Sequence, residues 1–325
     1  MVIDSDPLRR KWIELSGANP ERIAEYRPTL VAFLAYDRSR YPLFVGTGFV
    51  IAGNEHFALV ATAKHVLQEG ALRAQKPESA SASTQPFSTS RSTTPSIAPD
   101  KLRAVWMGKQ AGEMLRVGYV EYNDSLDVAI CLVMPEAGTN AFAPWTVPLD
   151  ISIPQVGDVV HMASLDRLRA YQTVAPQNAK GDGQTIKVET RVSLRMGKVT
   201  GVYQSGLRQY RWPCFTTTIP ADPGMSGGLV TLYRPNQTVA AIGVVCADAS
   251  SKSSHKNQKK PGESIIASTW PALSIQVPVV TSDSAPKLSL HEMMRLGRIE
   301  PAIGGIERLE VIDYGNGNRT IGFKD

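Results

Sequence analysis

The sequence has little cysteine and no long apolar run. The 325 residues include three cysteines, Cys131, Cys214 and Cys246. Their number is odd, and each lies in an apolar or strand-like segment. That placement favours buried thiols over a disulfide framework, and hence a reducing compartment. No stretch approaches the roughly 18 apolar residues of a membrane span, and the charged first ten residues lack the apolar core of a signal peptide. These absences predict a cytoplasmic location and no membrane partner.

The charge balance is only mildly basic. The net charge is +5, and part of the excess comes from residues 252–260, which include no aromatic residue for base stacking. A nucleic-acid-binding patch is the alternative interpretation of this run, but no other segment supports it. We therefore expect a solvated loop and no nucleic-acid partner. With 42% hydrophobic residues, the chain can bury a sizeable core.

The first 28 residues have helical patterning. Leu8, Trp12 and Leu15 recur at helical spacing after an Asp-Pro start, which predicts a helix over residues 6–17. Pro20 is typical of the first position of a second short helix. We expect residues 1–28 to form a helical N-terminal extension.

Residues 29–280 have the punctuation of an all-β protein, with short apolar runs separated by Gly, Pro, Asn and Asp. The runs fall into two sets of similar size, over 29–150 and 151–280. A Ser/Thr/Pro-rich stretch at about 77–100 is too poor in large apolar residues to pack, and we expect it to be a disordered insertion. Residues 281–325 predict a small extension made of a helix with a Ser289 and Glu292 capping box and a terminal hairpin.

The most informative segment is Asp222-Pro-Gly-Met-Ser-Gly-Gly228, which places Ser226 among glycines in a tight turn. Glycines allow backbone conformations in which amide N–H groups point outward instead of pairing in a sheet. The alternative interpretation is a hairpin turn in which Ser226 has no catalytic role. The match to G-x-S-x-G also allows the nucleophile elbow of α/β-hydrolases, but that fold needs a helix and a histidine after the serine. Strand-like residues follow Ser226, and only His255 and His291 come later.

Two upstream segments supply the partners that a nucleophilic serine needs. His65 follows a predicted strand, and Asp127 begins an apolar one, where a carboxylate needs a partner such as an imidazole N–H. That pairing would fix the tautomer so that the other ring nitrogen can accept the proton of Ser226. Asp124 is the competing carboxylate, in a more turn-like context than Asp127. A packed core histidine is the plain alternative for His65 taken alone.

Four motifs in this order resemble the chymotrypsin-fold (trypsin-like) serine proteases, in particular bacterial disulfide-free members such as the HtrA-type domains. They are Gly46-Thr-Gly-Phe49, Thr62-Ala-Lys-His65, Leu126-Asp-Val-Ala129 and Gly224-Met-Ser-Gly-Gly228. The resemblance covers roughly residues 29–280. It implies two six-stranded antiparallel β-barrels, with His65 and Asp127 from the first and Ser226 from the second.

The resemblance also implies a mechanism. Ser226 attacks a peptide carbonyl, His65 serves as base and then acid, and the N–H groups of Gly224 and Ser226 hold the oxyanion. No metal and no cofactor are expected, and the substrate is a protein or peptide. The resemblance therefore predicts an intracellular trypsin-like serine endopeptidase.

Two positions depart from the digestive enzymes of this family, and a third residue is a further candidate for the substrate pocket. Met225 replaces the aspartate that pairs with a new N-terminus after zymogen cleavage, so activation by that ion pair is not expected. Pro220, at the pocket-floor position, gives no charge for a basic side chain, whereas Asp248 is a candidate for selecting Lys or Arg. A surface carboxylate at a strand end is the alternative for Asp248.

A second hypothesis comes from Met225 and from the extensions, which a minimal protease does not need. It is a catalytically silent or partner-activated module of protease fold that binds or regulates. The presence of all three residues, His65, Asp127 and Ser226, argues against this hypothesis, because a module that does not catalyse a reaction has no chemical need for the full set. In either case residues 1–28 and 281–325 are candidates for docking a regulator or a second copy, with packing onto the barrels as the alternative.

Overall fold

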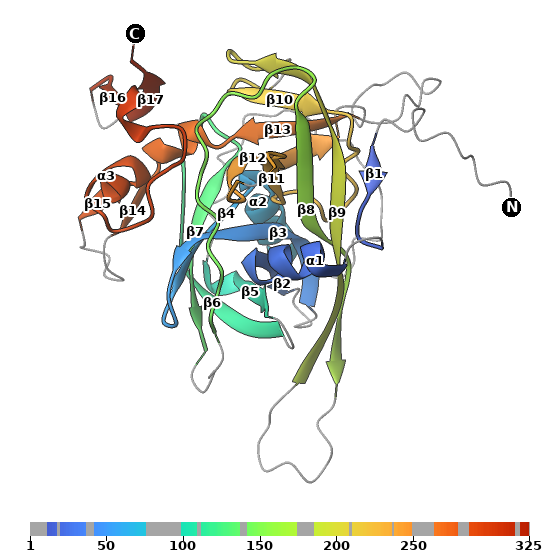
Figure 1. Cartoon of the computed structure of the whole chain (residues 1–325). Coiled ribbons are helices and arrows are strands. Elements are labelled where there is room, and N and C mark those ends of the chain that lie inside the picture. Colours follow the sequence, from blue (N-terminus) through green and yellow to red (C-terminus); the bar gives the residue numbers. More distant parts are fainter. Residues whose placement is uncertain are drawn as a thin grey trace, which may run out of the picture.

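A computed structural model of the chain describes most of its residues (Figure 1). The described ranges are 12–17, 20–36, 42–75, 99–108, 112–136, 142–173, 185–207, 210–235, 237–248, 263–278, 286–315 and 319–324. The predicted solvated loop at 252–260 and all of the predicted insertion at 77–100 except Pro99 and Asp100 lie outside these ranges. Those two residues begin η2 (Pro99–Lys101).

The first β unit is a closed barrel in the order β2-β3-β4-β7-β6-β5. Its antiparallel strands are β2 (Leu30–Tyr36), β3 (Pro42–Gly53), β4 (Ala58–Thr62), β5 (Leu102–Met107), β6 (Gly112–Tyr122) and β7 (Ala129–Pro135). Helix α2 (Lys64–Gln75) follows β4 directly and packs on the barrel at Gly70, where an added Cβ would meet Leu102 and Val45. This helix was not predicted from the sequence.

The second β unit is also closed, in the order β8-β9-β10-β13-β12-β11 with β9 and β8 paired. Its strands are β8 (Val159–Thr173), β9 (Thr185–Tyr203), β10 (Cys214–Thr217), β11 (Leu229–Leu232), β12 (Ala241–Asp248) and β13 (Ser264–Ser268). The long β8–β9 hairpin runs past the barrel in Figure 1. Two six-stranded antiparallel barrels confirm the predicted all-β fold.

The N-terminal segment differs from its prediction. The short helix that begins at Pro20 is confirmed as α1 (Pro20–Tyr26), and η1 (Arg27–Thr29) continues it. The helix predicted over 6–17 is wrong at its described end, because β1 (Ile13–Glu14) is a strand on the edge of β9. Pairing with an exposed strand edge satisfies backbone groups that a short isolated helix cannot keep bonded in water.

The C-terminal extension has the predicted helix and hairpin. Ser289 and Glu292 form the capping box of α3 (Leu290–Arg295), with both reciprocal hydrogen bonds present. The terminal hairpin pairs β16 (Leu309–Asp313) with β17 (Arg319–Phe323). The other elements of this region are η3 (Trp270–Ser274), β14 (Gln276–Pro278), β15 (Lys287–Ser289) and η4 (Ile306–Arg308).

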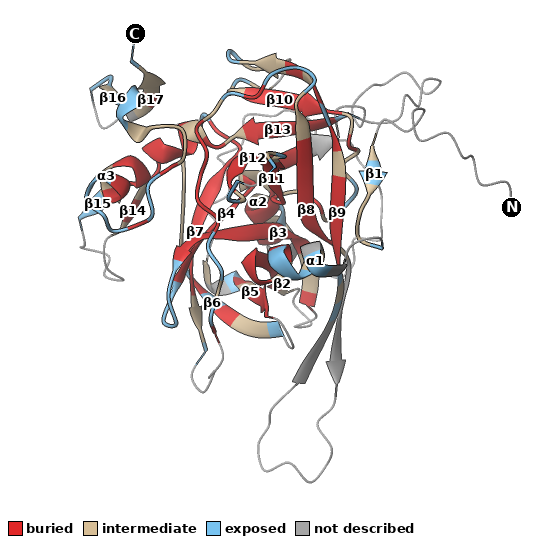
Figure 2. Ribbon diagram, viewed as in Figure 1, coloured by how far each residue is buried: buried red, intermediate tan, exposed pale blue. Residues whose placement is uncertain are grey.

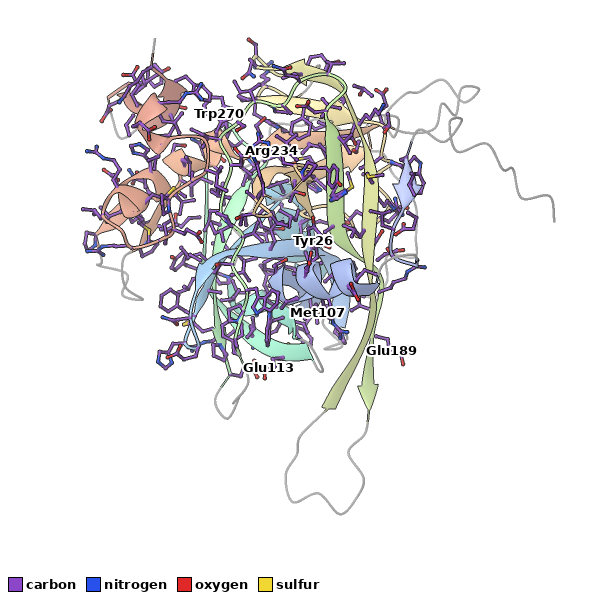
Figure 3. All side chains as sticks on the ribbon, viewed as in Figure 1. Tyr26, Met107, Glu113, Glu189, Arg234 and Trp270 are labelled. Carbon is purple, nitrogen blue, oxygen red and sulfur yellow. The ribbon has the colours of Figure 1, made fainter. Side chains whose placement is uncertain are left out.

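Buried residues line both barrels and continue into the C-terminal extension (Figure 2). Tyr26, labelled in Figure 3, joins α1 to the second barrel, since its hydroxyl lies 3.4 Å from both His161 Nδ1 and Thr231 Oγ1. Trp270, also labelled there, packs on Phe323 with ring centroids 5.2 Å apart. In the described part of the chain, no helix has the length and apolar character to span a bilayer.

Candidate active site

His65 is the second residue of α2, where the chain leaves the buried strand β4. Its backbone N–H donates to Asp127 Oδ1 at 3.0 Å, and its ring Nδ1 lies 2.7 Å from Asp127 Oδ2. Both carboxylate oxygens therefore bind the same residue, which fixes the imidazole against the first turn of α2. The positive end of the helix dipole favours a carboxylate at this point.

The two carboxylates that competed in the sequence have different surroundings. Asp127 is buried, with only 8% of its side chain exposed, whereas 82% of the Asp124 side chain is exposed. Asp124 lies beside Lys64 instead, with 3.9 Å between Nζ and Oδ1. Asp127 is thus the carboxylate that contacts His65, as the sequence analysis favoured.

Ser226 lies in a turn that enters β11 of the second barrel, between two left-handed glycines, Gly224 (φ +94°) and Gly227 (φ +84°). The turn is tied to the first barrel, because the Thr47 N–H donates to the Ser226 carbonyl at 2.8 Å. It is tied to β12 by the Gly227 N–H, which donates to the Val245 carbonyl at 2.7 Å. These bonds hold the serine at the junction of the two barrels.

Two observations place Ser226 next to the His65–Asp127 pair. Cys246 bridges them, because its carbonyl accepts from Ser226 Oγ at 3.3 Å while its Sγ lies 3.9 Å from the Asp127 carbonyl oxygen. A Cβ added at Gly46 would lie 2.9 Å from the Ser226 carbonyl oxygen and 2.6 Å from Val66, the neighbour of His65. The predicted serine, histidine and aspartate therefore meet in one place.

Among the described residues, two amides of the serine turn have no hydrogen-bond acceptor in the chain. The Met225 N–H donates to the Asp222 carbonyl at 3.0 Å. Within the described residues, the N–H groups of Gly224 and Ser226 have no acceptor in the chain. These two donors, on either side of one that is used, are available to stabilise an oxyanion.

The Met225 side chain lies in the protein interior. Its side chain is fully buried in the core cluster of the second barrel, and its Sδ accepts the Asp222 N–H at 3.3 Å. The position that carries an aspartate in the digestive enzymes is thus held here by apolar packing.

The two pocket candidates are placed unequally. The Pro220 carbonyl accepts from Arg195 Nη1 at 3.0 Å, so this residue is part of a buried network. Asp248 ends β12 opposite Ser264, but its side chain lies outside the described part of the structure.

Three residues around the site were not singled out from the sequence. Thr47 Oγ1 donates to the Gly224 carbonyl at 3.0 Å and accepts the Leu165 N–H at 3.1 Å, which joins both barrels to the turn. Cys246 was noted only as a buried thiol. Arg195 gave a usable signal, because an arginine stands in a strand-like run between Leu194 and Met196.

One family model matches the part of the chain that contains the site. The model of the trypsin-like peptidase domain matches residues 46–240, which contain His65, Asp127 and Ser226, and the chain belongs to this family. The solved structures include a similar one, the active form of the Rv3671c protease from M. tuberculosis, at 14% identity and a TM-score of 0.38. The alignment covers 78% of this chain and 81% of that one. No curated protein matches the chain.

Proposed function

We propose that the chain is a serine endopeptidase that works through His65, Asp127 and Ser226. The observation that carries the proposal is the paired contact of Asp127 with the ring and backbone of His65. Beside this pair lies Ser226, whose own N–H and that of Gly224 have no acceptor among the described residues. Membership of the trypsin-like peptidase family supports the same chemistry.

The reaction follows from these positions. Asp127 holds Nδ1 of His65 protonated, so that Nε2 can take the Ser226 proton as Oγ attacks the peptide carbonyl. The Gly224 and Ser226 N–H groups stabilise the oxyanion, and His65 then gives the proton to the leaving amine, which leaves an acyl ester on Ser226. Water, deprotonated by His65, hydrolyses the ester and restores the serine.

The finer features predicted from the sequence are part of the proposal. Three cysteines that are buried and unpaired support a reducing, cytoplasmic location. Pro220 and Asp248 stay candidates for the substrate pocket. The extensions at 1–28 and 281–325 stay candidates for contact with a regulator or a second copy.

A fluorophosphonate probe tests the proposal, because it reacts only with an activated serine. We expect labelling of the wild type at neutral pH, and none of Ser226→Ala or His65→Ala. Ser125→Ala and His56→Ala are the matched controls, since both residues are exposed and lie outside the site. A folded wild type without labelling would contradict the proposal and favour the module that binds or needs a partner.

A further inference from the structure

The segment before α1 is attached to the second barrel close to the serine turn. Ile13 pairs with Met196 of β9, and the pairing continues as the Leu15 N–H donates to the Leu194 carbonyl at 2.7 Å. The Leu194 N–H in turn donates to Ser16 Oγ at 2.8 Å. This backbone ladder fixes the position of the side chains between Trp12 and Ser16.

Arg195 connects that segment to the serine turn. Only 6% of its side chain is exposed, so the guanidinium needs partners for its donors. Nε donates to Glu14 at 3.0 Å, Nη2 to Asp222 at 2.5 Å and Nη1 to the Pro220 carbonyl at 3.0 Å. The Trp12 ring lies 4.9 Å from the guanidinium carbon and covers the remaining side.

The surroundings of Glu14 favour the charged form of its carboxylate. Burial raises the pKa of Glu14, but hydrogen bonds from Ser16 and Arg195 outweigh that effect and leave the pKa below its ordinary value. The Ser193 hydroxyl also donates to Glu14, at 3.3 Å. The carboxylate is therefore held charged beside Arg195 at neutral pH.

At its other end, the Arg195 network reaches Asp222, which is hydrogen-bonded to Met225 between the amides of Gly224 and Ser226. Asp222 and Met225 exchange two bonds, from the Met225 N–H to the Asp222 carbonyl and from the Asp222 N–H to the Met225 sulfur. A movement of Asp222 therefore shifts Met225 and, with it, the amides of Gly224 and Ser226 on either side. Half of the Asp222 side chain is exposed, and Arg195 is what binds its carboxylate.

We propose that Glu14 and Arg195 are positioning residues that align the anion-binding amides, so that the strand Ile13–Glu14 acts as a built-in activator of the serine turn. The proposal rests on the proposed peptidase function. It explains how the turn is ordered although Met225 offers no charge for an ion pair. In the described contacts, Glu14 is linked to the serine turn through Arg195, so both residues act on the amides through other residues.

The test compares full-length Glu14→Ala with wild type on a peptide substrate. Misaligned amides weaken binding of the transition state more than of the substrate, so we expect kcat to fall by about 10-fold to 100-fold with KM nearly unchanged. Glu21→Ala, which removes an exposed acid of α1, should keep wild-type kcat. Thermal melting of each variant establishes that it is folded.

Hydrogen exchange gives a second readout that does not depend on activity. We expect amides of residues 220–227 to exchange faster in Glu14→Ala than in wild type, with the first barrel unchanged. If Glu14→Ala fails to fold, Glu14→Gln replaces it, because the amide keeps the side-chain shape and loses the charge. The same changes are then expected at smaller amplitude.

The outcomes separate this inference from the proposed function. A folded Glu14 variant with wild-type kcat and wild-type exchange overturns the inference and leaves the peptidase function standing. If the wild type itself shows no labelling and no hydrolysis, the proposed function fails. Exchange at 220–227 then decides alone whether the strand orders the turn.

Discussion

Both oxygens of the Asp127 carboxylate bind His65, one through the backbone and one through the ring. An asparagine keeps the shape but presents an NH₂ group, which selects the wrong imidazole tautomer. We expect Asp127→Asn to lower kcat by about 10⁴-fold, as a lost triad carboxylate does in this mechanism. Steady-state hydrolysis of a peptide substrate measures the change.

The neighbouring carboxylate is the control for that substitution. Asp124 is exposed and contacts Lys64, so Asp124→Asn should leave kcat within about 2-fold of wild type, as surface changes usually have small effects. Equal losses in the two variants would count against the assignment of Asp127.

Gly227 has no room for a side chain. A Cβ would lie 1.9 Å from the Thr47 carbonyl oxygen and 2.3 Å from Thr62 Oγ1, at a φ of +84°. We expect Gly227→Ala to lower the free energy of unfolding by more than about 2 kcal/mol, measured by chemical denaturation. Gly17→Ala is the control, because no atom lies within 4 Å of its added Cβ. Equal stability of both variants would contradict this account.

The three thiols should be silent in the folded protein. Burial raises the pKa of Cys214 to about 11, and burial followed by the Asp127 charge holds the pKa of Cys246 well above its usual range. Burial also raises the pKa of Cys131. Because the thiolate is the reactive form, we expect no reaction with a thiol reagent at pH 8 until the protein is unfolded. All three should then react, and fast reaction of the native protein would be the contrary result.

At the scale of elements, the long buried strands were predicted from the sequence, whereas a short edge strand and one helix were not. Strands β2, β3 and β4 could be predicted because most of their residues are buried, and buried strands consist of continuous apolar runs. The strand Ile13–Glu14 could not be predicted from the sequence, because two residues are too few to show an alternating pattern. This strand forms because it pairs with the edge of β9. Helix α2 was missed because its apolar residues follow a buried strand without a polar cap.

Acid should release the edge strand. The pKa of Glu14 is lower in the folded protein than in the unfolded chain, so its contribution to stability is present above an unfolded pKa near 4.5 and is lost as pH falls through the folded value. We expect the protection of residues 13–16 against hydrogen exchange, measured relative to the intrinsic rate at each pH, to fall in that acidic range. In Glu14→Gln, which has no carboxylate at this position, this fall should be absent. A wild type with the same profile as Glu14→Gln would contradict the expectation.

At the scale of the whole molecule, the ordered motifs were the useful signal. The motifs around histidine, aspartate and serine, taken in that order, carried the resemblance to the chymotrypsin-fold proteases. That resemblance, and not the order alone, implied two barrels with the site between them. Thr47 and Arg195 act across the molecule through pairs 177 and 181 residues apart in the chain, and no local pattern encodes such contacts. Residue types at the site were therefore predictable, while the contacts that support them were not.

The C-terminal extension belongs to the main core. Leu290, Met294 and Ile321 are buried in the same cluster as Phe33 of the first barrel. Each such side chain contributes about 1.5–3 kcal/mol, against a total stability of about 5–15 kcal/mol. We expect deletion of residues 281–325 to lower the melting temperature sharply or to prevent folding. An unchanged melting temperature would contradict the packing and would leave docking of a partner as the role of this segment.

The edge strand also has a consequence for the order of events during synthesis. Glu14 leaves the ribosome early, but Arg195 follows 181 residues later, and the serine turn later still. Non-local pairs of this separation form late, because the closure of long loops must come first. A nascent chain that contains His65 and Asp127 but ends before Arg195 and Ser226 therefore has neither the serine nor the aligned amides, so on the proposed function it cannot cut neighbouring chains.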